Sequence, residues 1–223
     1  MVIEKNVNIT ESRIDKHELE IIRLENLKIE EKKLYSNGSK YICGIDEAGR
    51  GPLAGPVAVG AVILPENSMI EGVNDSKKIS EKKRKKIYTQ IIEEAISYSV
   101  GIVDQNKIDE INILESTKLA LKIALEGLEI KPDIIMVDAL NNIDTLGIPY
   151  ISVIKGDEKV YSIAAASIIA KVTRDRIMSE FDEIYPAYGF ARHKGYGTAE
   201  HIRVIKEQGP CMIHRKSFIK NFI

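Results

Sequence analysis

Short runs of apolar residues alternate with longer amphipathic stretches over most of this chain of 223 residues. A run of four to eight apolar residues bounded by polar or turn-forming residues is typical of a β-strand. Acidic residues directly follow the first and the fourth of these runs, and Pro65 closes the second. The pattern predicts five strands, at residues 41–45, 57–64, 96–103, 134–137 and 150–154.

Longer stretches with helical spacing separate the later strands. Two of them start at Ser80 and Thr198, whose side chains are favourable helix N-caps. The others are defined by apolar positions three to four residues apart. We therefore predict helices at residues 80–94, 108–128, 160–185 and 198–208, with one or two looser helices between residues 14 and 34.

The predicted helix at residues 160–185 begins with small side chains. Ser162, three consecutive alanines and Ser167 lie in its first turns, and Pro186 ends it. Because small side chains allow two backbones to approach closely, we expect this helix to pack tightly on the sheet or on its neighbours.

The order of these elements predicts an α/β fold. The first three strands favour an antiparallel meander, and the later strand–helix–strand connections favour parallel pairing in a mixed sheet with helices on its faces. We divide the chain into a helical N-terminal extension (residues 1–38), a core (residues 39–185) and a helical C-terminal segment (residues 186–223).

Composition narrows the class of protein. Hydrophobic residues make up 44% of the chain, enough for one core, and no apolar run has the length of a membrane span. The N-terminus lacks the pattern of a secretory signal, and the two cysteines form no disulfide framework. We expect a cytoplasmic protein with no membrane partner, and a monomer by default.

Charge leaves the partner open. The formal net charge of −1 does not by itself indicate a nucleic-acid binder. The basic run at residues 82–86 is equally consistent with a solvated helix face and with contacts to phosphates.

Acidic residues at the ends of predicted strands form the candidate reactive site. Asp46 and Glu47 follow the first strand, Asp138 follows the fourth, and Asp157 lies just beyond the fifth. If these strand ends are neighbours, the carboxylates repel one another unless a cation binds between them. Oxygen-only ligands suit Mg²⁺ or Mn²⁺, which together with water hydrolyse phosphodiesters. Helix caps and solvated loop acids are the alternative explanation of the same residues.

A long motif then identifies a resemblance. Residues 46–57, from Asp46 through Gly49, Arg50 and Gly51 to Val57, closely resemble the signature of the ribonuclease HII family. Further matches follow in the order found in that family, over about residues 40 to 218. They lie at residues 75–78, 137–139, 155–157, 164–175, 193–198 and 214–218.

The resemblance implies a ribonuclease H-like fold with a five-stranded mixed sheet. It implies that Asp46, Glu47, Asp138 and Asp157 are the catalytic, metal-binding acids, with Mn²⁺ or Mg²⁺ as cofactor. The expected partners are RNA–DNA hybrids and duplex DNA that contains single ribonucleotides. The expected reaction cuts on the 5′ side of a ribonucleotide and leaves a 3′-hydroxyl and a 5′-phosphate.

The resemblance also implies substrate contacts. The turn Gly49-Arg50-Gly51 corresponds to a ribose-sensing turn, and Tyr196 to a tyrosine that stacks on the sugar after the ribonucleotide. Expected phosphate contacts are Lys77, Lys171, Arg192, His193 and Lys194, whereas no general-base role is assigned to a histidine.

Two other functions stay open from the sequence. Type 3 ribonucleases H, which act on hybrids, carry Lys in the glycine turn where this chain has Arg50, and they have an additional N-terminal domain for which residues 1–38 are too short. An inactive hybrid-binding module is disfavoured because all four acids are present. Residues 219–223 form no clear sliding-clamp motif. Met212 departs from the family pattern, in which a proline is common before the Ile-His pair.

Overall fold

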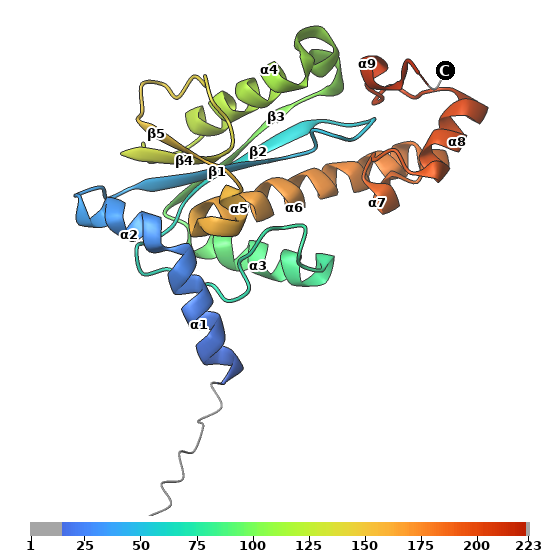
Figure 1. Ribbon diagram of the computed structural model, residues 1–223. Coiled ribbons are helices and arrows are strands. Elements are labelled where there is room, and N and C mark those ends of the chain that lie inside the picture. Colours follow the sequence, from blue (N-terminus) through green and yellow to red (C-terminus); the bar gives the residue numbers. More distant parts are fainter. Residues whose placement is uncertain (1–14, 222–223) are drawn as a thin grey trace, which may run out of the picture.

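The computed structural model describes residues 15–221 and contains a five-stranded sheet in the order β3-β2-β1-β4-β5 (Figure 1). The central strand β1 pairs antiparallel with β2 and parallel with β4. Strand β3 is antiparallel to β2, and β5 is parallel to β4. The predicted mixed sheet is therefore confirmed. Its strands are β1 (Ile42–Ala48), β2 (Val57–Ile63), β3 (Ser97–Val103), β4 (Ile134–Asp138) and β5 (Tyr150–Val153).

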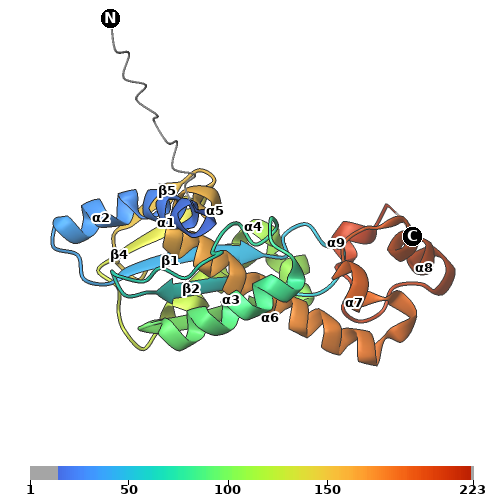
Figure 2. The same cartoon turned by 90° about the horizontal axis from the view of Figure 1, so that it is seen from below.

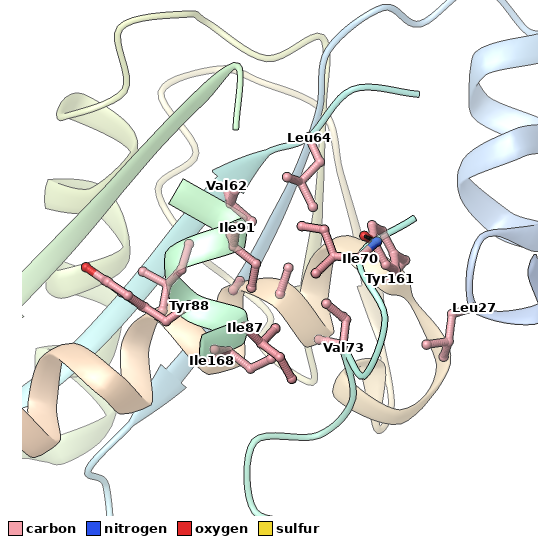
Figure 3. Close-up of a cluster of buried hydrophobic side chains, with 14 of the residues drawn as sticks. Leu27, Val62, Leu64, Ile70, Val73, Ile87, Tyr88, Ile91, Tyr161 and Ile168 are labelled. Carbon is pink, nitrogen blue, oxygen red and sulfur yellow. Dashed lines mark hydrogen bonds between the residues drawn. The ribbon is translucent and has the colours of Figure 1, made fainter. Parts of the chain in front are cut away.

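Helices cover both faces of the sheet. Helix α4 (Gln105–Glu126) lies on one face, and α3 (Glu81–Glu94) and α6 (Tyr161–Ile184) lie on the other (Figures 1 and 2). Side chains of β2, α3 and α6, among them Val62, Ile91 and Ile168, form a buried cluster on the second face (Figure 3). Apolar residues buried on both sides explain why β2 is buried at all seven positions.

The small residues at the start of α6 allow close packing on the sheet, as the sequence predicted. A Cβ atom at Gly44 of β1 would overlap the backbone of Ser162, and one at Gly60 of β2 would lie 2.6 Å from the carbonyl oxygen of Ala166. Ala166 itself is fully buried. Helix α6 therefore crosses β1 and β2 at backbone contact distance.

Among the described residues, two helices precede the sheet, α1 (Lys16–Leu27) and α2 (Ile29–Ser36). The predicted helical extension is helical at residues 16–27 and 29–36, and residues 1–14 lie outside the described part. Lys28, between the helices, donates to the carbonyls of Glu66 and Ser68, and Glu31 of α2 accepts from the backbone N–H of Ser162 at 2.7 Å. Buried ionic groups thus fix the extension to the core.

The C-terminal segment has a small core of its own at the far end of α6 (Figure 1). Phe190 and Ile205 are buried there. An isolated bridge between Ala54 and His214 connects this segment to the loop after β1. Its short elements are a 3-10 turn (Pro186–Tyr188), α7 (Phe190–His193), α8 (Ala199–Gln208) and α9 (Lys216–Ile219).

The structure corrects several predicted boundaries. Strand β1 continues through Asp46 and Glu47 to Ala48, because β2 pairs with it as far as the Ala48–Ala58 position. Helix α4 starts three residues earlier than predicted, with Asp104 as its N-cap. A four-residue helix, α5 (Gly156–Lys159), was not predicted. Across residues 15–221, no helix combines the length and apolar character needed to cross a membrane.

Candidate active site

The four predicted acids lie at or just beyond the carboxyl ends of the parallel strands β1, β4 and β5. Asp46 and Glu47 lie near the end of β1, and Asp138 is the last residue of the adjacent parallel strand β4. The β1–β4 register pairs Ile45 with Val137, so Asp46 and Asp138 occupy the next positions on neighbouring strands. Asp157 follows β5 on the short helix α5. Parallel pairing thus converts three distant sequence positions into one group of carboxylates.

Burial and mutual repulsion dominate the electrostatics of this group. The pKa of Asp46, which is only 5% exposed, is raised well above its usual value by burial first and then by the charges of Glu47 and Asp138. Burial also raises the pKa of Glu47 and of Asp157, and the Asp138 carboxylate adds to both shifts. The arrangement therefore disfavours full ionisation in the absence of a cation.

Few hydrogen-bond donors offset this charge. Asp46 accepts from the backbone N–H of Glu47, and Asp138 accepts from that of Gly156, both at 2.7 Å. Two cations flank the group: Arg50 Nη1 lies 3.3 Å from Glu47 Oε1, and Lys77 Nζ lies 3.6 Å from Asp157 Oδ2.

The donor set suits a hard divalent cation. All four groups present carboxylate oxygens, the ligands that Mg²⁺ and Mn²⁺ prefer. Within residues 15–221, no three His, Cys, Asp or Glu side chains already stand close enough together to hold an ion. The four residues therefore fit a divalent cation through their oxygen donors and their excess negative charge. Binding of the cation requires the carboxylates to move closer together.

The glycine turn after β1 is held by two buried arginines. Arg215 donates to the carbonyl oxygens of Gly49 at 2.6 Å and Arg50 at 3.0 Å. Arg174 donates to those of Pro56 at 2.9 Å and Ala54 at 3.1 Å. Gly49 has a φ of +100°, which favours glycine, and a side chain there would overlap Arg174.

Sequence reasoning did not assign these arginines a role. Both lie within the motifs at residues 164–175 and 214–218, and that position was the sequence feature that could have indicated a function for them. Burial lowers the pKa of Arg174 to about 10 and that of Arg215 to about 9, so both remain cationic at neutral pH. Their guanidinium groups fix the path of the turn by backbone hydrogen bonds alone.

Some of the predicted substrate residues lie beside the acids and the turn. Arg50 and Lys77 adjoin Glu47 and Asp157, as described above, and the Lys77 side chain is 75% exposed. The ring of Tyr196 faces Gly51: a Cβ atom at Gly51 would lie 3.9 Å from its Cε1 atom. Tyr196 is 44% exposed and open to a ligand.

The other predicted phosphate contacts have partners within the protein. Lys171 Nζ lies 2.6 Å from Asp175 Oδ1, and Arg192 is paired with Glu200. His193 is hydrogen bonded to the Tyr188 carbonyl at 2.7 Å, and Lys194 Nζ to the Ser179 hydroxyl at 3.0 Å. These residues belong to α6 and the segment after it, and among residues 15–221 none of them forms an ion pair with the four acids. The pairs involved are Lys171–Asp175, Arg192–Glu200, His193–Tyr188 and Lys194–Ser179.

Comparison with known proteins agrees with the fold. The chain resembles the crystal structure of the ribonuclease H2 from Pyrococcus horikoshii OT3, with a TM-score of 0.69 and 30% identity over 82% of this chain and 96% of that one. A structure described as Bst-RNase HIII in complex with Mn²⁺ has the same fold at 21% identity and a TM-score of 0.58, over 78% of this chain and 65% of that one. The protein is thus an enzyme of the ribonuclease H class.

Sequence comparison defines the family more narrowly. The family model for Ribonuclease HII matches residues 43–221. A Ribonuclease HII from Acetivibrio thermocellus is 55% identical over 221 residues, which cover 99% of this chain and 86% of that protein. This chain belongs to the ribonuclease HII family, whose members are endonucleases acting on RNA–DNA substrates.

Proposed function

We propose that the four carboxylates bind divalent metal ions, Mg²⁺ or Mn²⁺, and that the enzyme uses them to cut the RNA strand of hybrids and to cut 5′ to single ribonucleotides in duplex DNA. The observation that carries this proposal is the group of acids near the carboxyl ends of β1, β4 and β5, in which burial and the charges of neighbouring acids raise the pKa values of Asp46, Glu47 and Asp157. A divalent cation removes the repulsion and supplies Lewis acidity for phosphodiester hydrolysis.

In this proposal the acids converge on the metal ions as a set of oxygen ligands. Asp46 and Asp138 are held in place by backbone N–H donors on Glu47 and Gly156. Hydrolysis adds water at phosphorus and breaks the bond to the 3′-oxygen, which leaves a 3′-hydroxyl and a 5′-phosphate. Lys77, beside Asp157 and largely exposed, is placed to contact a phosphate next to the scissile one.

The turn Gly49-Arg50-Gly51 supplies discrimination of RNA from DNA in this proposal. Backbone groups at glycines approach a sugar without side-chain obstruction, and a 2′-hydroxyl can both donate to and accept from them. Arg215 donates hydrogen bonds to the carbonyls of Gly49 and Arg50, so the turn presents its backbone groups to the sugar in a fixed geometry. Tyr196, facing Gly51, is placed to stack on the following sugar. The C-terminal segment, residues 186–223, serves in this scheme as a substrate-binding part.

Cleavage of two labelled substrates tests the proposal. One is duplex DNA with a single ribonucleotide, and the other is an RNA strand paired with DNA, each with Mg²⁺ or Mn²⁺ and with EDTA as control. We expect metal-dependent cutting of both, 5′ to the single ribonucleotide. Cutting of the long hybrid alone indicates the type 3 specificity, and intact strands in both metals contradict the catalytic proposal. The Asp46→Asn variant controls for contaminating nuclease.

A further inference from the structure

Three histidines are packed together in the C-terminal segment, outside the group of acids. His201 of α8 and His214 before α9 are buried, at 0% and 3% exposure. The ring of His193 stacks on that of His201 with centroids 4.3 Å apart, and the ring of Phe190 lies nearly perpendicular to both. Histidine is the side chain whose protonation and tautomer are most readily set by its neighbours.

The hydrogen bonds of His201 and His214 allow one neutral arrangement. His201 Nδ1 lies 2.9 Å from the carbonyl oxygen of Tyr196, which only accepts, so Nδ1 carries the proton. His201 Nε2 is then an acceptor, and His214 Nε2, 3.0 Å away, donates to it. His214 Nδ1 is left as an acceptor, and the backbone N–H of Cys211 donates to it at 2.9 Å.

These three bonds therefore run in one direction, from Cys211 through His214 and His201 to Tyr196. Each ring uses both nitrogens, and an added proton on His201 Nε2 would place two donors face to face. Burial lowers the pKa of His201 to about 4 and also lowers that of His214, in agreement with neutral rings. His193 has a separate chain, in which it accepts from Gly195 N–H and donates to the Tyr188 carbonyl.

The pair connects both sides of the proposed substrate surface. On one side, His201 holds the backbone of Tyr196. On the other, His214 forms the bridge to Ala54, and the next residue, Arg215, holds the carbonyls of Gly49 and Arg50. The Leu53 N–H donates to the Gly195 carbonyl at 2.8 Å, which joins the two sides directly.

We propose that His201 and His214 are positioning residues that hold Tyr196 beside the Gly49–Gly51 turn through a directed chain of neutral imidazole hydrogen bonds. The inference rests on the proposed function in one respect, the contact of Tyr196 with the substrate sugar. The histidines themselves touch no substrate: they act through the Tyr196 carbonyl and through the backbone that leads to Arg215.

Two amide substitutions at His201 separate the two bonds of the ring. The amide nitrogen of His201→Asn occupies about the position of Nδ1 and keeps the donor to Tyr196, whereas the amide of His201→Gln reaches the Nε2 position and keeps only the contact with His214. Each variant loses one buried hydrogen bond, so we expect similar losses of thermal stability. We expect KM for the single-ribonucleotide duplex to rise about 5- to 10-fold in His201→Gln, with kcat little changed, and to stay near wild type in His201→Asn.

Controls keep this result specific. Glu207→Gln, at an exposed acidic residue of α8 that offers no cation to a phosphate, controls for any change in that helix. In a Tyr196→Ala background the two His201 variants should have equal KM values, because the group they position is gone. Equal KM values for His201→Asn and His201→Gln in the wild-type background overturn the proposal.

Nitrogen NMR of the imidazoles gives a readout independent of activity. At neutral pH we expect the Nδ1–H tautomer for His201 and the Nε2–H tautomer for His214, with a coupling or exchange-protected signal for the proton between them. A charged ring or the opposite tautomer at either residue overturns the proposal without any cleavage assay. If the wild type cuts neither substrate, the proposed function fails, while the hydrogen-bond chain is still decided by these spectra.

Discussion

Asp46 illustrates how much one buried carboxylate affects both stability and activity. Its pKa is raised in the folded chain by burial and by Glu47 and Asp138, whereas in the unfolded chain it titrates near 4. The folded state therefore holds the proton more tightly. The associated stability is fully present below the unfolded pKa and is lost as pH rises through the folded pKa.

We predict that Asp46→Asn stabilises the metal-free protein at neutral pH and nearly abolishes cleavage. The free energy of unfolding of the wild type, measured by urea titration without divalent ions, should fall relative to that of the variant as pH rises above about 4. Cleavage should drop more than about 100-fold, since even outer-shell partners of metal ligands contribute about 10- to 100-fold. Added Mg²⁺ should stabilise the wild type more than the variant. A stability difference that is constant with pH, or turnover close to wild type, contradicts the role given to Asp46.

Arg50 tests the discrimination by the glycine turn. Its side chain lies beside Glu47, and its carbonyl is held by Arg215. We predict that Arg50→Ala lowers kcat/KM on a single ribonucleotide about 10-fold and on a long hybrid clearly less. Loss of the pairing with Glu47 makes the turn less rigid, and a long hybrid offers many alternative 2′-hydroxyls. Lys77→Ala is the matched comparison, since loss of a phosphate contact weakens both substrates alike. Equal losses for Arg50→Ala on both substrates count against the ribose-sensing role.

At the scale of elements, α2 provides an acceptor to the start of α6. Glu31 is buried and accepts from the N–H of Ser162, in the first turn of a helix whose N-cap residue, Val160, has no polar side chain. Burial is the main cause of the raised pKa of Glu31, so its charge is costly in this place while its acceptor oxygen is needed. The helical extension is thus part of the packing of the central helix.

We predict that Glu31→Ala destabilises the protein by about 1–3 kcal/mol, because it leaves a buried N–H without a partner. Glu31→Gln should lose less, since it keeps an acceptor without a buried charge. Glu30→Ala, which removes an exposed ion pair with Lys33 on the same helix, should change the free energy of unfolding by well under 1 kcal/mol. Urea denaturation of the three variants measures the differences, and an equal effect of Glu30→Ala and Glu31→Ala would exclude the proposed role.

The sequence predicted elements best where local pattern and packing agree. Helices α3 and α8 begin one residue after their predicted caps, Ser80 and Thr198, because both side chains accept a backbone N–H three residues on. The extension of β1 through Asp46 and Glu47 was not predictable, since it comes from pairing with β2 and not from apolar residues. Helix α5 is too short to carry a periodic pattern.

At the scale of the whole molecule, the site depends on strand order. The sequence pattern predicted acids at strand ends, and the parallel pairing of β1 with β4 brings the carboxyl ends of these two strands side by side. The supports of the turn depend instead on contacts between residues more than 100 positions apart, from Arg174 and Arg215 to the loop after β1. No local pattern reports such contacts, and none reports that Lys171 pairs with Asp175.

Because the whole molecule carries almost no net charge, its affinity for a nucleic acid depends on local contacts between basic side chains and phosphates. Lys and Arg number 32 and Asp and Glu 33, so no net positive charge attracts a polyanion. Each phosphate that a basic side chain neutralises releases counterions, and the logarithm of the binding constant falls with the logarithm of salt concentration by about 0.9 per contact. The slope therefore counts contacts and can be compared between variants.

We predict that binding of the Asp46→Asn protein to an RNA–DNA duplex weakens steeply between about 50 and 200 mM salt. Lys77→Ala in that background should reduce the slope by about one contact, because Lys77 is largely exposed next to the acids. Lys171→Ala should leave the slope unchanged, because its ammonium group is already paired with Asp175 and only 18% exposed. Fluorescence anisotropy over a salt series measures both. A reduced slope for Lys171→Ala would mean that this ion pair opens toward the duplex, and a flat response of the parent protein would contradict phosphate-dominated binding.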